Sequence, residues 1–222
     1  MHIGLIGGTG PAATVFYYRA LVRLYANANR RLDLTIANAD AKEVVNNLDS
    51  GNQMAQAAVF AKYIDQLKAA GCEAVALTSM GAHFCMGALE PMSSLPLMSA
   101  LPALEAHFSA INVKKVGVLG TRAVMESRLY GLAGVEVVTV PHDELGTAHA
   151  HYVAMAIAGK ATHEQRAYFE NAALRLADER AAEAIVLGGT DLFIAFDKPS
   201  YPYPVVDCAL VHAEAIAQVG MC

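Results

Sequence analysis

Two short loops carry the side chains in this sequence that could transfer protons. The first, residues 78–85, reads T-S-M-G-A-H-F-C and places Ser79 four residues before His83. The second, residues 188–192, reads G-G-T-D-L and contains Asp191. A serine hydroxyl is a nucleophile only beside a base, and His83 would be that base if its loop folds back. Asp191 would be a general base if it lies in a cleft.

Both loops also have a structural interpretation. The residues around Ser79 lack the G-x-S-x-G pattern of a nucleophile elbow. We therefore favour Ser79 as a hydrogen-bond donor to a ligand or to the start of a helix. Thr190 and Asp191 suit a helix N-terminus, as cap or first-turn residues. For Asp191, the sequence leaves the choice between cap and base open.

A glycine-rich loop near the N-terminus offers an anion site. Residues 8–13 read G-T-G-P-A-A, which fits the G-x-G-x-x-A pattern of dinucleotide-binding proteins. Asn38 and Asp40 are the nearest candidates for the acid that holds the ribose, but their spacing is loose, and Pro11 is unusual in that pattern. We favour a tight turn that offers the N-terminus of a helix to a carboxylate or a phosphate.

Two histidines, His149 and His151, suggest a metal site at first sight. On a helix, residues two apart do not share a face, so the pair would chelate a metal only from a strand or a loop. We expect surface or capping histidines instead.

The elements that would position these loops alternate between strands and helices. Strand patterns cover residues 2–7, 32–38, 73–77, 95–98, 115–121, 135–140, 183–189 and 204–207, and helical patterns cover residues 12–29, 53–70, 125–132, 148–158, 163–180 and the last segment. The pattern of residues 3–9 returns at 115–121, and that of 73–79 returns at 183–189, with an offset of roughly 110 residues. The sequence predicts two equivalent α/β halves with parallel sheets.

In such folds, ligands bind beyond the carboxyl ends of the strands. The loops at those ends should therefore face one another across a cleft between the halves. These loops are residues 8–11, 38–43, 78–85, 120–125 and 188–193.

The composition is that of a globular protein with a large core. Of the 222 residues, 55% are hydrophobic and 17% are charged, and the net charge is −5. Since there is no long run of Lys and Arg, we expect no nucleic-acid partner. We find neither a signal-peptide pattern nor an apolar run of about 18 residues, so we expect a cytoplasmic protein without a membrane span. The four cysteines should be reduced thiols, because none forms a C-x-x-C pair: Cys72, Cys85, Cys208 and Cys222.

Several segments, in this order, resemble the aspartate/glutamate racemase superfamily, on its aspartate-racemase side. Residues 6–14 read I-G-G-T-G-P-A-A-T and are similar to the family's G-G-M-G-P-x-A-T start. Residues 119–127 read L-G-T-R-A-V-M-E-S and match its L-G-T-x-x-T-M-E segment. Residues 205–207 match its late strand. The resemblance covers essentially the whole chain.

This resemblance implies two pseudo-symmetric Rossmann-like halves, residues 1–98 plus 205–222 and residues 99–204, with an active site between them. It also implies a homodimer that acts on a small amino acid or carboxylate without a cofactor. In the family, one cysteine from each half faces the substrate Cα; one removes a proton and the other supplies one. The residues expected to bind the substrate are Thr9, Gly10, Asn38, Gly81, Thr121 and Thr190.

The sequence departs from the family at both cysteines. The family's C-N-T-x-H motif corresponds to residues 79–83, S-M-G-A-H, so Ser79 stands at the first cysteine position. The G-C-T-E motif corresponds to residues 188–191, G-G-T-D, which puts Gly189 at the second. We expect Cys85 and Cys208, which are near these motifs, to be core residues.

The departure speaks against racemisation by two cysteines. Any proton transfer must then be carried by Ser79, His83 or Asp191. Two other hypotheses stay open beside that of a racemase-like enzyme. One is a catalytically silent homologue that only binds its ligand, and the other is an enzyme with one-sided proton transfer, such as a decarboxylase or a lyase.

Overall fold

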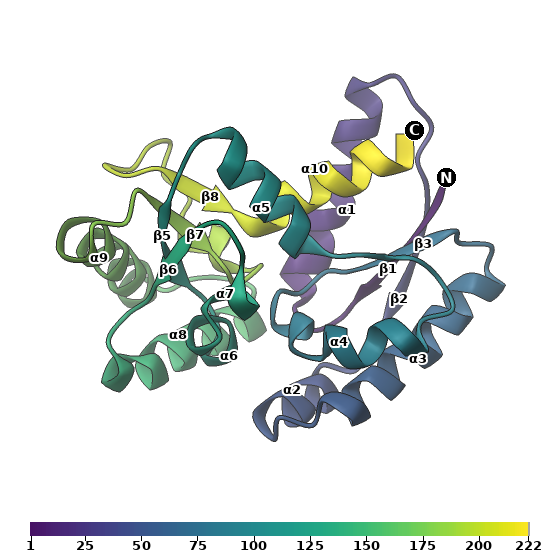
Figure 1. The fold of residues 1–222 in the computed structure, drawn as a ribbon, viewed down its shortest axis with the longest axis horizontal. Helices are drawn as coiled ribbons and strands as arrows, with labels where there is room; N and C mark the ends of the chain where they lie inside the picture. The colour runs from purple at the N-terminus through teal and green to yellow at the C-terminus, as the bar shows by residue number, and fades with distance from the viewer. Residues whose placement is uncertain (222) are drawn as a thin grey trace. The chain divides into compact units, whose positions relative to one another are not determined.

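The computed structural model describes residues 1–221 and divides the chain into two α/β units. Unit 1 consists of Met1–Ser99 and His212–Cys222, and unit 2 of Ala100–Val211. Each unit contains one four-stranded parallel sheet flanked by helices (Figure 1). The fourth cysteine of the sequence, Cys222, lies outside the described residues.

The sheet of unit 1 has the strand order β2-β1-β3-β4. Its strands are β1 (His2–Gly7), β2 (Asp33–Asn38), β3 (Ala74–Leu77) and β4 (Leu97–Met98). All four residues of β3 are buried, and β1 is buried over all but its first residue. Such continuous apolar burial is typical of central strands in a parallel sheet, because helices cover both faces.

Different helices cover the two faces of this sheet. On one face, α1 (Pro11–Asn27) packs along β1, and Ile3 lies against Gly220 of α10 (Cys208–Met221). On the other face, α3 (Gln53–Ala69) packs so closely that a Cβ at Gly4 would lie 3.0 Å from Leu67. The remaining helical segments of this unit are α2 (Ala41–Asp49), η1 (Gly81–Cys85), α4 (Met86–Leu89) and η2 (Glu90–Met92).

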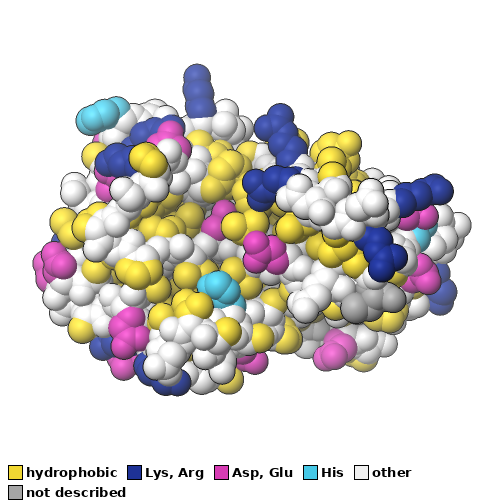
Figure 2. Space-filling view, turned by 90° about the horizontal axis from the view of Figure 1, so that it is seen from above, with side chains coloured by type: hydrophobic (Ala, Val, Ile, Leu, Met, Phe, Trp, Pro, Cys, Tyr) yellow, Lys and Arg dark blue, Asp and Glu magenta, His cyan; other side chains and the backbone are white. Residues whose placement is uncertain are grey.

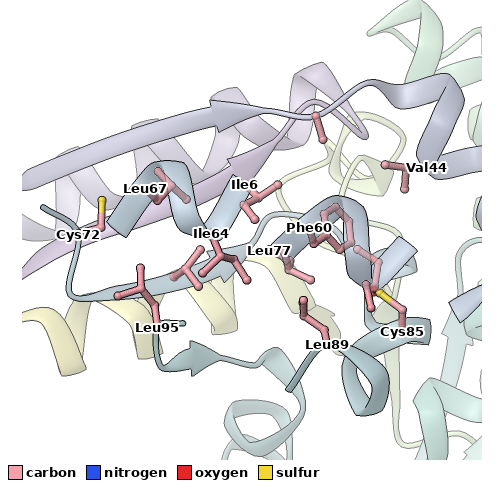
Figure 3. Close-up of a cluster of buried hydrophobic side chains, with 14 residues drawn as sticks. Ile6, Val44, Phe60, Ile64, Leu67, Cys72, Leu77, Cys85, Leu89 and Leu95 are labelled. Carbon is pink, nitrogen blue, oxygen red and sulfur yellow. The ribbon is translucent and has the colours of Figure 1, made fainter. Parts of the chain in front are cut away.

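An apolar cluster fills the space between α3 and the sheet (Figure 3). Phe60 and Ile64 of α3 pack there with Ile6 of β1 and Leu77 of β3, and each is at most 3% exposed. Full burial of one such side chain stabilises the fold by roughly 1.5–3 kcal/mol. Because Cys85 belongs to the same cluster, the packing fixes both ends of the loop that carries Ser79.

Unit 2 repeats this arrangement with the strand order β6-β5-β7-β8. Helix α9 (His163–Arg180) packs on the central strands, where a Cβ at Gly117 would lie 2.9 Å from Leu176. The strands are β5 (Lys115–Leu119), β6 (Glu136–Val138), β7 (Ala184–Leu187) and β8 (Val205–Asp207). The other helical segments are α5 (Ala100–Ala110), α6 (Arg122–Glu126), α7 (Arg128–Gly131), η3 (His142–Glu144), α8 (Leu145–Ala158) and η4 (Leu192–Ile194).

The two equivalent α/β halves predicted from the sequence are confirmed, since both sheets are parallel and share one strand order. Two details need correction. Residues 205–222 were expected to belong to the first half as a whole, yet β8 pairs with β7 in unit 2, and the chain returns to unit 1 only at His212.

The second correction concerns residues 125–132, which the sequence predicts as a helix. Helix α6 ends at Glu126, and Arg128, Leu129 and Tyr130 follow with φ of 51°, 54° and 57°. These values belong to the left-handed region, so this turn cannot continue a right-handed helix.

The face in Figure 2 mixes charged side chains of both signs with hydrophobic ones. Within residues 1–221, no helix combines the length and the apolar character that crossing a bilayer requires.

The backbone conformation at the end of α9 predicts how two glycine substitutions change the free energy of unfolding. Ala181, which is exposed, closes the helix with a left-handed φ of 54°. Glycine adopts this conformation without steric cost. Ala181→Gly should raise the free energy of unfolding by about 1 kcal/mol, whereas Ala167→Gly inside α9 should lower it by about 1 kcal/mol. Urea denaturation of both variants checks this, and equal losses would contradict it.

Candidate functional site

The glycine loop of unit 1 is held rigidly between β1 and α1. Gly8 has φ of 96°, and a Cβ there would overlap the carbonyl oxygen of Ala39, so only glycine fits. The Thr14 hydroxyl accepts a hydrogen bond from the Gly8 N–H (3.0 Å) and donates one to the Gly10 carbonyl (3.2 Å). Thr9, half-buried, lies inside this clamped loop.

No side chain among residues 1–221 caps the start of α1. Gly10 is the N-cap residue and has no side chain that could bond the first amides, and the first turn contains no acidic residue. Asn38 lies exposed at the end of the adjacent strand β2, and its Nδ2 donates to the Ala39 carbonyl (3.2 Å). The positive end of the helix dipole is thus not neutralised by a side chain of its own first turn.

The loop after β3 brings Ser79, Gly81 and His83 together. His83 is buried, and its Nδ1 donates to the backbone carbonyl of Ser79 (3.0 Å). A Cβ at Gly81 would lie 3.5 Å from the Ser79 hydroxyl oxygen, and Ser79 is half-buried. The loop does fold back, as the proposed Ser–His relation requires. The hydrogen bond, however, joins His83 to the backbone of Ser79 and not to its hydroxyl.

His83 lies beside a second buried histidine, His212 of α10, with the ring centroids 6.2 Å apart. His212 donates from Nε2 to the Met98 carbonyl (2.9 Å), so its Nδ1 must accept the hydrogen bond from the Tyr17 hydroxyl (2.9 Å). Burial lowers the pKa of His83 to about 4. Burial and the nearby His83 lower the pKa of His212 to about 3. Both rings are therefore neutral at pH 7.

In unit 2, the loops after β5 and β7 lie against each other. A Cβ at Gly120 would lie 3.0 Å from the backbone of both Gly188 and Gly189. The Thr121 hydroxyl caps α6 by accepting from the Val124 N–H (3.3 Å). Thr190 is 2% exposed. The structure thus brings Thr121, Thr190 and Asp191, three of the predicted residues, to neighbouring loops of one sheet.

Asp191 is buried and accepts a hydrogen bond from a tyrosine that was not among the site residues predicted from the sequence. The Tyr152 hydroxyl, from α8, donates to Asp191 Oδ2 (3.2 Å), and both residues are at most 7% exposed. Although Asp191 precedes η4, its side chain forms no cap hydrogen bond to that short helix within the described residues. Asp191 thus occupies the N-cap position of η4, as one of the two interpretations left open by the sequence predicted, while its side chain accepts the hydrogen bond from Tyr152.

The Tyr152 ring also occupies the space beside Gly189. A Cβ built on Gly189 would lie 2.7 Å from Cζ and 2.9 Å from Cδ2 of that ring. Such distances are far below van der Waals contact. Any side chain at position 189 therefore requires the Tyr152 ring to move.

Tyr152 was missed because its neighbours are distant in sequence and because a helical tyrosine is usually a core residue. One signal in the sequence could have pointed to it. Where the related motif has a side chain, this chain has Gly189, so another residue must fill the space.

The two histidines nearby, His149 and His151, both lie on α8. His149 accepts a hydrogen bond from the Arg122 N–H (3.3 Å), which agrees with the expected capping role.

Comparison with known proteins identifies the family. The sequence profile of the Asp/Glu/Hydantoin racemase family matches residues 6–216. The chain belongs to this family.

Solved structures of family members share the fold over the full length of the chain. A protein proposed to be an Asp/Glu racemase from Yersinia pestis superposes with a TM-score of 0.85 at 23% identity, covering 100% of both chains. An aspartate racemase homologue from Pyrococcus horikoshii gives 0.82 at 21%, covering 100% of this chain and 99% of the other. Glutamate racemase from Francisella tularensis, solved with D-glutamate, gives 0.70 at 15%, covering 99% and 80%. At these identities, the likeness shows the fold.

The thiols of this racemase-family chain are poorly suited to proton transfer. Cys72, Cys85 and Cys208 are all buried, and Cys85 lies within the apolar cluster of Figure 3. Burial raises the pKa of Cys85 to about 12. Burial and the adjacent Asp207 raise the pKa of Cys208 well above its usual value. The prediction that Cys85 and Cys208 are core residues is confirmed, and both thiols are protonated at neutral pH.

The contact between Gly189 and Tyr152 predicts an energetic coupling. Gly189→Ala should lower the free energy of unfolding by about 1–3 kcal/mol, because the new methyl group overlaps the Tyr152 ring. In a Tyr152→Ala background, the same change should cost less than about 1 kcal/mol. Urea denaturation of the four proteins measures the coupling. Gly87→Ala is the control, since a Cβ there meets no atom within 4 Å, and equal costs in both backgrounds would contradict the overlap.

The two buried histidines predict a loss of stability in mild acid. Their folded pKa values lie below the unfolded value of about 6.5, so their contribution is complete above pH 6.5 and is lost as the pH falls towards 4 and then 3. For His83 alone, the loss amounts to roughly 3 kcal/mol. Urea denaturation between pH 7 and pH 4 should show this decline, and His212→Asn should make it shallower. The exposed His163 is the control, since His163→Asn should leave the slope unchanged.

Proposed function

We propose that this protein binds a small amino acid or another small carboxylate without a cofactor, and that it transfers a proton on one face of the ligand Cα. One observation carries this proposal. The buried carboxylate of Asp191 lies at the carboxyl ends of β5 and β7, whereas the described cysteine thiols are buried and protonated. The acid–base group at these loops is thus a carboxylate and not a thiol.

The ligand class follows from the anion-binding features of the loops. The uncapped start of α1, behind the clamped loop of Thr9 and Gly10, suits a carboxylate. The hydroxyl groups of Ser79, Thr121 and Thr190, together with Gly81 and Asn38, are our candidates for further contacts. Since the Francisella tularensis relative was solved with D-glutamate, acidic amino acids are the first ligands to test.

The reaction class follows from what the two motif positions contain. We assign Ser79 and Gly189 to the family's cysteine positions. A serine hydroxyl is far less acidic than a thiol, and glycine supplies no acid or base. Racemisation needs a base on one face and an acid on the other. Exchange, elimination or decarboxylation needs only one such group, which a single carboxylate can serve.

A silent ligand-binding homologue is the second candidate. The contact that favours it is the hydrogen bond from His83 to the backbone of Ser79, which uses the histidine to hold the loop. If this is the only role of His83, the first motif keeps its shape for binding and has no base of its own.

Solvent exchange at Cα separates the two candidates. L- and D-aspartate and L- and D-glutamate are incubated with the protein in D₂O and followed by proton NMR, with dissociation constants from calorimetry. We expect exchange in the wild type and its loss at neutral pH in Asp191→Asn. Ser79→Ala should weaken binding and leave the exchange rate of the bound ligand within about threefold. Asp178→Asn, on the exposed side of α9, is the control. Saturable binding without exchange would establish the binding protein instead.

A further inference from the structure

Tyr152 stands where a side chain at position 189 would have to be. The Cβ of such a side chain would lie 2.7 Å from Cζ of the Tyr152 ring, the carbon that carries the hydroxyl. The phenol therefore enters the space that the second cysteine would use if Gly189 occupies its position. Filling that space alone would require only a phenylalanine. The chain has a tyrosine there, and its hydroxyl is directed at a carboxylate.

The hydroxyl and the carboxylate form a hydrogen-bonded pair. Tyr152 donates to Asp191 Oδ2 over 3.2 Å, and both residues are buried at the end of β7. Burial and the charge of Asp191 raise the pKa of Tyr152 well above its usual value. The phenol thus keeps its proton at neutral pH. A second acid, the half-buried Asp207, lies at the end of the neighbouring strand β8, where its Oδ1 accepts from the Ala209 N–H (2.9 Å).

We propose that Tyr152 and Asp191 act as one acid–base pair that replaces the second thiol of the family, with Tyr152 touching the ligand and Asp191 acting through it. This inference rests on the proposed ligand and reaction class. A purely structural pair, in which Tyr152 only satisfies a buried carboxylate, is the alternative that the experiment must exclude.

The proton balance of the pair is simple. In the resting state, the pair holds one proton, on the phenol, and one negative charge, on Asp191. When the ligand Cα–H bond breaks, its proton moves to the phenol oxygen while the phenol proton moves to Asp191. The bonding electrons remain on the ligand as an enolate. The reverse movement returns a proton to Cα, and no oxidant, reductant or cofactor takes part.

Because removal and return use the same oxygen, the proton is exchanged on one face of the ligand. The product in D₂O therefore carries deuterium at Cα and keeps its configuration. Two-base racemisation would instead invert the configuration of deuterated product. Retention of configuration excludes two-base racemisation, and the Tyr152 variant then separates the pair from a carboxylate that acts alone.

The test uses the full chain with L- and D-aspartate and L- and D-glutamate in D₂O. Proton NMR gives the exchange rate, chiral chromatography gives the configuration, and calorimetry gives the dissociation constant. The variants are Tyr152→Phe and Asp191→Asn. The control is Tyr168→Phe, because the hydroxyl of Tyr168 is buried without a hydrogen-bond partner among the described residues. Thermal unfolding checks that each variant is folded.

We expect exchange with retention in the wild type and in Tyr168→Phe. In Tyr152→Phe, exchange should fall at least 100-fold while the dissociation constant changes less than threefold. In Asp191→Asn, the pH profile of exchange should move to alkaline pH, since the phenol must then ionise without a carboxylate to take its proton. A structural role would leave that profile in place.

Three results would contradict the proposal that Tyr152 and Asp191 act as one acid–base pair. These are unchanged exchange in Tyr152→Phe, inversion in the wild type, and binding of an amino acid without any exchange. The last result would leave the proposed ligand intact. Absence of binding to all four amino acids would instead remove the ligand on which both proposals depend.

Discussion

The parallel pairing of β5 with β7 is the constraint on which the candidate site in unit 2 depends. The two strands end at the same edge of the sheet, so the turns that follow them must share one small space. Three glycines make this possible, because a Cβ at Gly120, Gly188 or Gly189 would lie 3.0 Å or less from a neighbouring atom. The buried pair of Tyr152 and Asp191 lies in the space that remains.

In unit 1, close packing also holds the loop that carries the first motif, but through different side chains. There, the loop after β3 is held by the hydrogen bond between His83 and Ser79, and His83 in turn lies against His212 of α10. The first motif is thus fixed by neutral, buried rings, and the second by a hydrogen-bonded carboxylate. Two loops that occupy equivalent places in two similar sheets therefore hold different titratable side chains.

Much of the fold could be predicted from the sequence, because strands such as 74–77 and 184–187 are uninterrupted apolar runs that recur in the same order. The turn at Leu129 could not be predicted, since its apolar residues have helical spacing while its backbone is left-handed. Asp191 and His83 stood out as titratable residues near turns. Tyr152 did not, because its importance depends on contacts with residues that are far away along the chain.

The mutual fit of Gly189 and Tyr152 also limits how this sequence can change over evolutionary time. A single substitution that introduces cysteine at position 189 meets the tyrosine ring, and a smaller residue at position 152 alone leaves Asp191 buried without this hydrogen bond. Either step by itself is unfavourable, and only both together reopen the route to a thiol. Positions 152 and 189 are therefore epistatic, because the effect of a substitution at one depends on the residue at the other.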